Sequence, residues 1–233
     1  MFFLSSLLNP YIAIIGDLKH SQQVENRGEM QKKLQDTLSR INRLYAEDIA
    51  AKFTITLGDE FQGLLSAGKS VLDILLDIER EMYPQQIRFG IGIGEITTEI
   101  NPEIAIGADG PAYYMARKAI DFLKESESKN QVSRSYIRIE QEGEPHATVL
   151  LINTMLSLLT TLRDSWTDRQ REVIWDLLVH KDSQSEAALR LDISQSSVQK
   201  NLTGGNYYAY AETRATIKSA LSEIIHKEKG DEI

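Results

Sequence analysis

The sequence contains no cysteine, which excludes disulfide bonds, thiolate metal sites and cysteine nucleophiles. A chain without disulfides suits a reducing compartment. The apolar start, MFFLSSLL, carries no basic residues and is soon interrupted by Asn9 and Pro10, so we expect no signal peptide. No apolar run approaches the roughly 18 residues that a membrane span needs. The sequence therefore predicts a cytoplasmic protein that makes no membrane contact.

An excess of positive charge is also missing. The formal net charge is -8, and residues 150–233 hold ten Lys and Arg against twelve Asp and Glu. Broad, non-specific binding to nucleic acid requires a positive surface that displaces counterions. Any contact with DNA is therefore expected to come from a small local patch. The 42% of hydrophobic and 26% of charged residues are ordinary for a protein with a buried core, and 233 residues are enough for two domains.

The N-terminal part alternates between strand-like and helix-like patterns. Their order, β-α-β-β-α-β-α-β, indicates an α+β fold: a ferredoxin-like split-βαβ domain over residues 1–146, with an antiparallel sheet covered by helices on one side. Ser66 is expected to cap the second helix. Gly90, Gly92 and Gly94 alternate along one strand and indicate a close backbone approach. The predicted strands cover residues 11–15, 51–57, 61–65, 87–96 and 135–140, and the predicted helices 25–45, 66–82 and 112–123.

Acidic side chains end the first strand and form the turn between the second and third. Asp17 follows YIAIIG, and Asp59 and Glu60 stand in the turn. In a split-βαβ sheet the first strand lies beside this hairpin, so the carboxylates converge. A divalent cation relieves the repulsion between neighbouring carboxylates. We therefore predict a Mg²⁺ or Mn²⁺ site at Asp17 and Asp59, with Glu60 in a supporting position. The alternative is that each aspartate only caps N–H groups of its own turn.

Basic residues follow the first strand and are suited to binding an anion. Residues 19–28 lead into a helix, and the first N–H groups of a helix favour a phosphate. Lys19 and Arg27 would neutralise the charge that such a ligand brings. Because Mg²⁺ is commonly bound together with substrate phosphates, the predicted ligand is a nucleotide or another phosphorylated small molecule.

The segment Leu57–Phe61, LGDEF, resembles the metal-binding hairpin of the nucleotide cyclases and of GGDEF-type diguanylate cyclases. Asp17 after YIAIIG resembles the first-strand metal aspartate of that superfamily, and IRFGIGIGEI resembles the cyclase segment that follows the hairpin. Over most of its length the chain resembles the SatD family. The resemblance implies a cyclase-like palm domain in which Asp17 and Asp59 bind metal. It also implies that Arg117 takes the place of the arginine that stabilises the transition state.

Other cyclase residues are replaced. Leu57 stands where GGDEF enzymes have a glycine that leaves room for guanine. Ile55 stands where class III cyclases usually have a base-reading lysine, and Tyr113 where they have an asparagine. Stabilisation of charge in the transition state is usually the largest catalytic contribution. The resemblance therefore implies binding of a nucleotide without turnover, and it leaves open whether the protein is an enzyme.

The C-terminal part, residues 147–233, is predicted to be wholly helical. Thr167 and Ser194 have the character of residues that cap helices, and a short helix over 185–191 lies between the two helices that they begin. Ala188 is small enough for close packing within this unit. The segments TDRQREV and ISQSSV resemble the helix-turn-helix of LuxR-type regulators and of sigma-factor region 4.

This second resemblance implies that the helix after Ser194 reads DNA. Gln, Asn and Ser side chains bond to base edges, and a Lys reaches a phosphate. Such motifs usually read two half-sites, so a homodimer is expected. The alternative is a three-helix unit for dimerisation or protein docking, which the acidic charge favours. The predicted DNA-binding residues are Gln195, Ser196, Ser197, Gln199, Lys200 and Asn201.

The sequence leaves three functions open. The leading hypothesis is a DNA-binding regulator whose N-terminal domain senses a nucleotide or phosphorylated ligand through a divalent metal. The second is a metal-dependent nucleotidyl cyclase or another phosphoryl-transfer enzyme. The third is a non-catalytic protein-interaction adaptor, in which the acidic turn at Asp59 is only a local cap.

Overall fold

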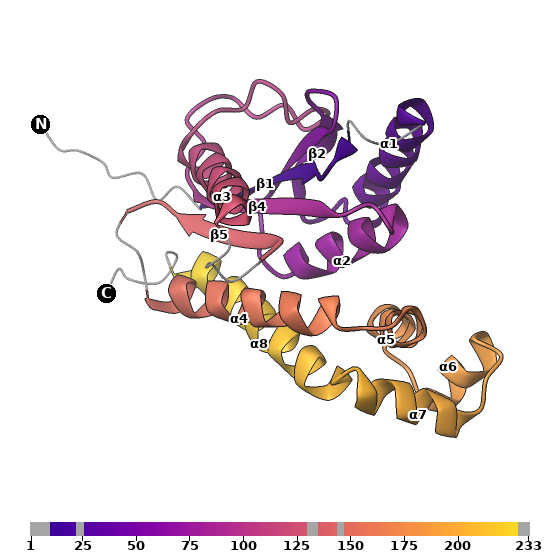
Figure 1. The fold of residues 1–233 in the computed structure, drawn as a ribbon. Coiled ribbons are helices and arrows are strands. Elements are labelled where there is room, and N and C mark those ends of the chain that lie inside the picture. Colours follow the sequence, from indigo (N-terminus) through magenta and orange to yellow (C-terminus); the bar gives the residue numbers. More distant parts are fainter. Residues whose placement is uncertain (1–9, 22–25, 130–134, 144–146, 228–233) are drawn as a thin grey trace, which may run out of the picture.

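The computed structural model describes residues 10–21, 26–129, 135–143 and 147–227 (Figure 1). These residues form a mixed α+β protein with five strands and eight helices. The strands are β1 (Tyr11–Leu18), β2 (Ile49–Ile55), β3 (Glu60–Leu65), β4 (Ile87–Gly94) and β5 (Ile137–Gln141). The helices are α1 (Arg27–Leu44), α2 (Val71–Met82), α3 (Pro111–Ser128), α4 (Ala147–Asp164), α5 (Asp168–His180), α6 (Gln184–Arg190), α7 (Gln195–Gly204) and α8 (Tyr207–Lys227).

The five strands form one sheet in the order β2-β3-β1-β4-β5. β2, β3, β1 and β4 pair with one another in antiparallel fashion, and their order is that of a split-βαβ unit. The prediction of a fully antiparallel sheet is wrong at one edge, because β5 pairs with β4 in parallel. The connection between these two strands contains α3, and a helical crossover of this kind joins parallel strands.

Helices cover both faces of the sheet, so the prediction of a one-sided cover is also wrong. α1 and α2 lie on one face and α3 lies on the other (Figure 1). The cause is visible in β1, where Ile12 and Ile14 face the first layer and Ala13 and Ile15 face the second, and all four are buried. A strand that is apolar on both sides requires a cover on each face.

The alternating glycines of β4 let α3 approach the sheet closely, as the sequence predicted. A Cβ atom added at Gly92 would lie 1.9 Å from the carbonyl oxygen of Ala112, and one at Gly90 would lie 2.3 Å from that of Ala116. Both contacts are with the backbone of α3. The positions therefore admit only glycine at this separation between helix and strand.

Two predicted boundaries are corrected. β1 continues to Leu18, so Asp17 lies inside a strand with a neighbour on each side and not in a turn. α2 begins at Val71 after Ser70, so Ser66 is not its N-cap. The N–H of Ser66 instead donates to the carbonyl of Asp48 at 2.9 Å, which holds the end of β3 against the start of β2.

The helical part packs directly against the sheet domain. α4 lies along β5, where the side-chain amide of Asn153 bonds to both the N–H and the carbonyl of Ile139 at 2.8 Å. α4 and α8 run side by side, and α5, α6 and α7 lie at their far end (Figure 1). Buried residues of both parts, among them Ile139, Ile152 and Val173, belong to one continuous core.

The predicted division at residue 146 falls at 144–146, which lie outside the described residues. The division into two domains therefore stays a prediction. None of the helices in the described part of the chain combines the length and the apolar character that crossing a membrane demands.

Candidate functional site

Asp17, the first residue of the predicted metal pair, is buried and forms ion pairs with both carboxylate oxygens. In the register of the sheet it lies opposite Glu60 of β3 and Arg88 of β4. Its Oδ2 atom is 2.5 Å from Nη1 of Arg88, and its Oδ1 atom is 2.8 Å from Nζ of Lys124 on α3. The carboxylate is therefore already neutralised by two cations of the chain.

The same arginine extends the network to the end of α3. Arg88 also bonds to Glu127, and Glu127 lies 2.7 Å from Nζ of Lys19. The Lys19 ammonium sits 4.6 Å from the centre of the Tyr136 ring. Lys19, predicted to meet a phosphate, is thus engaged within the protein. Arg27, which was also predicted to bind a phosphate, is exposed at the start of α1. Arg117, the third residue predicted for a nucleotide or phosphate, is paired with Glu60.

Asp59 and Glu60 of the hairpin turn have separate partners. The hydroxyl of Ser21 donates to the Asp59 carboxylate, and the Asp59 carbonyl accepts from the N–H of Leu18 at 3.1 Å. Glu60 forms a bidentate pair with Arg117, with both N···O distances at 2.6 Å. The structure therefore places Asp17, Asp59 and Glu60 at one end of the sheet, as predicted, but ties each side chain to a different group.

These residues do not fit a divalent cation in the arrangement observed. A Mg²⁺ or Mn²⁺ ion requires free carboxylate oxygens, whereas Arg88 and Lys124 occupy both oxygens of Asp17. In the described part of the chain no cluster of three or more His, Asp or Glu side chains could hold a metal. Arg88, Lys124 and Glu127, which complete the network, were not predicted, because no local sequence pattern links these positions to Asp17. The metal at Asp17 and Asp59 stays a prediction.

The network is expected to stabilise the fold in a pH-dependent way. Burial raises the pKa of the Glu127 carboxyl, but hydrogen bonds and charge from Arg88 and Lys19 outweigh it, so the pKa lies below its ordinary value of 4.5. The stabilisation is therefore present above pH 4.5 and is lost as the pH falls through the lower folded-state pKa. We expect Glu127→Gln to lower the free energy of unfolding by at most about 1 kcal/mol at pH 7, with a smaller difference in acid.

Denaturant unfolding of the wild type and Glu127→Gln between pH 3 and 7 measures this dependence. Glu99→Gln, in an exposed loop, is the control and is expected to follow the wild-type curve. An equal loss of stability for Glu127→Gln at every pH would contradict the lowered pKa of Glu127 as the cause of the pH dependence.

α5, α6 and α7 form a capped three-helix unit. Thr167 accepts from the N–H of Gln170 while the Gln170 side chain accepts from the N–H of Thr167, a capping box that begins α5. Ser183 and Ser194 accept from the third N–H of α6 and α7 respectively. The prediction that Thr167 and Ser194 cap helices is confirmed. The unit closes over Ala187, Ala188, Val173, Ile174, Leu177, Val198 and Leu202, all of which are buried.

The outward face of α7 carries the predicted DNA-binding residues. Gln195, Ser196 and Lys200 are exposed. Gln199 is exposed too, but its side-chain oxygen accepts from Gln184 at 2.7 Å, and the Asn201 amide donates to the Ser197 carbonyl at 2.9 Å. Three of the six predicted residues are thus exposed without a bond to another helix, and the others are bonded within the unit or partly covered.

Positive charge is sparse around α7. The guanidinium of Arg190, the cation that ends α6, is bonded to Asp176 and Asp182. Among the described residues of α6 and α7, Lys200 is the basic side chain that carries no ion pair. The described residues of α6 and α7 therefore form no extended basic face, and contact with DNA stays a prediction.

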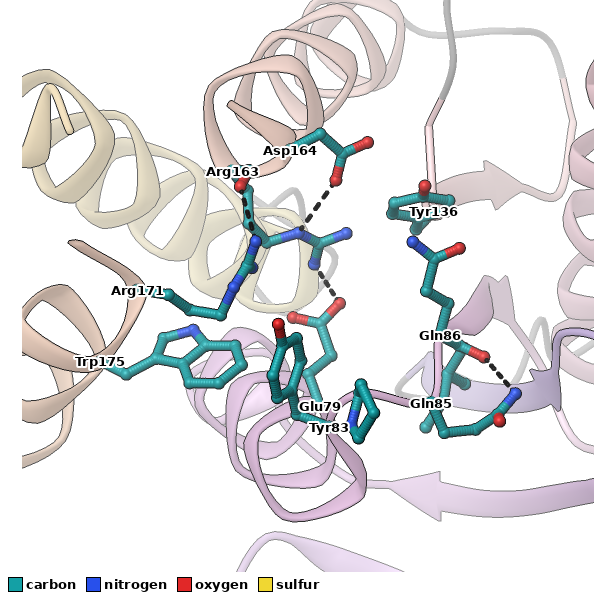
Figure 2. Close-up of a pocket in the computed structure, with 11 residues that line it drawn as sticks. Glu79, Tyr83, Gln85, Gln86, Tyr136, Arg163, Asp164, Arg171 and Trp175 are labelled. Atoms are coloured by element: carbon teal, nitrogen blue, oxygen red, sulfur yellow. Dashed lines mark hydrogen bonds and ion pairs between the residues drawn. The ribbon is translucent and has the colours of Figure 1, made fainter. Parts of the chain in front are cut away.

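A small cavity of about 70 Å³ lies where the three-helix unit meets the sheet domain (Figure 2). Arg163 at the end of α4 is buried and pairs with Glu79 of α2. Arg171 of α5 reaches the same place and donates to the Arg163 carbonyl at 3.3 Å, with its guanidinium beside the rings of Tyr83 and Trp175. Burial lowers the pKa of Arg163, but the charge of Glu79 outweighs it and the pKa is raised. This junction fixes α5 relative to α2.

By its fold the protein is a split-βαβ sheet protein whose C-terminal helices pack against the sheet. The sequence profile of the SatD family matches residues 11–221, and the chain belongs to the SatD family. No curated protein matches it.

Three solved structures are similar over part or most of the chain. A bacterial light-regulated adenylyl cyclase shares 15% identity over 57% of this chain and 76% of its own, with a TM-score of 0.41. A guanylate cyclase domain from Catenaria anguillulae, solved with GTP, shares 16% over 48% and 73%, with a TM-score of 0.37. A regulator of polyketide synthase expression from Bifidobacterium adolescentis shares 12% over 96% and 86%, with a TM-score of 0.26. Similarity at this level transfers no activity.

Proposed function

We propose that the protein is a DNA-binding regulator in which α6 and α7 act as a helix-turn-helix and α7 enters the major groove. One observation supports this proposal above the others. Ser194 caps α7, Val198 and Leu202 bury one side of the helix, and the opposite side presents polar residues to solvent. A recognition helix needs this division, because its first turns must contact base edges while its other side holds the unit together.

The charge distribution sets the expected mode of binding. Lys200 is the cation available on α7, so few counterions are released when one unit binds. A single unit is therefore expected to bind weakly, and useful affinity requires two units on two half-sites, about 34 Å apart. We propose a homodimer for this reason. Specificity then rests on Gln195 and Ser196, which are exposed near the start of α7.

The test begins with selection of duplexes from a random library at about 50 mM salt, where electrostatic contacts are strong. The recovered duplex is then titrated by fluorescence anisotropy with the wild type and two variants. We expect Lys200→Ala to weaken binding at every site and to reduce the salt dependence by about one released counterion per protomer. We expect Gln195→Ala to cost about 1–3 kcal/mol and to relax the preference at one base pair.

Lys32→Ala is the matched control, since Lys32 is an exposed lysine on α1 in the sheet domain. It is expected to leave DNA affinity unchanged. No enriched sequence after selection, or equal weakening by Lys32→Ala and Lys200→Ala, would reject the proposal. The three-helix unit would then be better explained as a protein-docking module.

The phosphoryl-transfer alternative has less support. Ile55 replaces the lysine that reads the base in class III cyclases, and Tyr113 replaces an asparagine that they carry. The carboxylate of Asp17 is held by Arg88 and Lys124. Catalysis would require this carboxylate to exchange two cations of the chain for a metal. We therefore propose that the protein acts by binding and does not catalyse phosphoryl transfer.

A further inference from the structure

A second cavity, of about 250 Å³, lies where α2 of the sheet part meets α5 and α8 of the helical part. α2, the end of α5 and the middle of α8 line it. Its charged side chains are Asp73 from α2, Lys181 from the end of α5, and Arg214 and Lys218 from α8. Three basic groups thus surround one carboxylate, and no other acidic side chain of the described residues lines the cavity. The cavity is positive in a protein whose net charge is -8.

One carboxylate faces these three cations, of which the Lys181 and Lys218 side chains are 63% and 36% exposed. Lys218 and Lys181 both approach the same oxygen, Oδ2 of Asp73, at 2.5 and 3.5 Å. Arg214 donates to the carbonyl of Leu72 at 2.8 Å and has no carboxylate within 4.0 Å among the described residues. Arg214 is only 8% exposed. Asp73 is the charge that Arg214 feels, but without a direct ion pair, so an anion in the cavity would give this guanidinium a charged contact partner.

The rest of the wall is apolar or small. Leu72, Leu76 and Leu178 line it. Ala211 and Ala215 line it from α8 with small side chains, which fill little of the space. The combination suits a dianionic head group that meets the three cations, attached to a small neutral body that rests on the apolar wall.

We propose that this cavity binds a phosphomonoester, with Arg214, Lys218 and Lys181 holding the phosphate. The carboxylate of Asp73 keeps the two lysines in place when no anion is bound. Since burial is outweighed by hydrogen bonding and charge from Lys218, then Lys181 and Arg214, the pKa of Asp73 is lowered and the carboxylate is ionised at neutral pH. The bound anion therefore competes with Asp73 for the lysines. This binding does not depend on contact with DNA.

The competing explanation is that the three basic groups only neutralise Asp73. Phosphate binding by the wild type separates the two explanations, because cations that serve only Asp73 leave no saturable anion site while that carboxylate is present. Asp73→Asn then tests the competition. It removes the competing charge, so phosphate is expected to bind more tightly than to the wild type, by about tenfold if about one charge-assisted bond is gained.

The experiment titrates the full chain with inorganic phosphate, glycerol phosphate and glycerol by calorimetry, at constant ionic strength set with chloride. We expect saturable binding of phosphate and of glycerol phosphate and none of glycerol. Lys218→Gln is expected to weaken binding about tenfold or more. Tighter glycerol phosphate than phosphate identifies the monoester as the natural class, and equal affinity identifies free phosphate, still at this site. Circular dichroism confirms that each variant is folded.

Lys200→Gln is the matched control, because it removes the same charge from α7 and not from the cavity. It is expected to leave phosphate binding unchanged while it weakens DNA binding. No saturable binding of either anion, or equal losses in Lys218→Gln and Lys200→Gln, would overturn the inference. Because DNA binding is measured separately, failure here leaves the proposal for α7 intact.

Discussion

Gly92→Ala is expected to destabilise the protein more than any other substitution of a single hydrogen by a methyl group in the described core. The added Cβ would lie 1.9 Å from the carbonyl oxygen of Ala112 and 2.3 Å from the nitrogen of Ala116. Both atoms belong to the backbone of α3, so no side-chain rotation relieves the contact. α3 must shift away from β4, which loosens one whole face of the sheet. We expect a loss of about 3 kcal/mol or more, the upper end of the range for overpacking.

Urea unfolding followed by far-UV circular dichroism measures this loss. Gly28→Ala is the control, because the only atom near an added Cβ there is Oδ1 of Asn26, at 3.8 Å. Gly28 lies in the first turn of α1, where alanine favours the helix by up to about 1 kcal/mol. Similar midpoints for the two variants would show that α3 adapts to the strand without cost.

The sequence contained the signal for this close approach but not the identity of the partner. Alternating glycines on a strand require some backbone to lie against them, and this was predicted correctly. Which helix supplies that backbone depends on the crossover from β4 to β5, and therefore on a parallel pair at the sheet edge. The apolar periodicity of a segment predicts the secondary structure of that segment alone. It does not predict which face of the sheet a later helix covers.

The candidate site at the end of the sheet shows the same limit. The adjacency of Asp17 and the hairpin turn follows from strand order, and it was predicted. The partners of the carboxylates depend on the exact register, which places Asp17 opposite Glu60 and Arg88, and on the angle at which α3 brings Lys124 over the strand. A register shift of one residue would reverse the faces. By contrast, the caps at Thr167 and Ser194 are local, and local residues predicted them.

The cavity at Asp73 lies furthest from sequence reasoning. Lys218 is 145 residues from Asp73, and the hydrogen bond of Arg214 to Leu72 spans 142. Asp73, Arg214 and Lys218 each look, in the sequence, like an ordinary charged residue on the surface of a helix. Only the packing of α8 against α2 brings them together.

Arg163→Met is expected to cause the largest loss among the charged positions. Arg163 and its partner Glu79 have side chains that are only 10% and 11% exposed. Without the guanidinium, the Glu79 carboxylate remains in a poorly hydrated site with no counter-charge. Removing one member of a buried ion pair costs about 3–5 kcal/mol for this reason. The same substitution withdraws the cation that packs 4.9 Å from the centre of the Tyr136 ring, and so loosens the contact of α4 with the sheet.

The double variant Glu79→Gln/Arg163→Met distinguishes a charge effect from lost packing. If the unpaired carboxylate causes the loss, neutralising it recovers most of the stability, since buried pairs can be replaced by neutral groups at little cost. Arg169→Ala is the control, because Arg169 and Glu172 are 43% and 49% exposed and an exposed pair contributes at most about 1 kcal/mol. Denaturant unfolding followed by tryptophan fluorescence reports on both Trp166 and Trp175 beside the junction. If the double variant is no more stable than Arg163→Met, the junction is held by the packing of the arginine stem and ring and not by its charge.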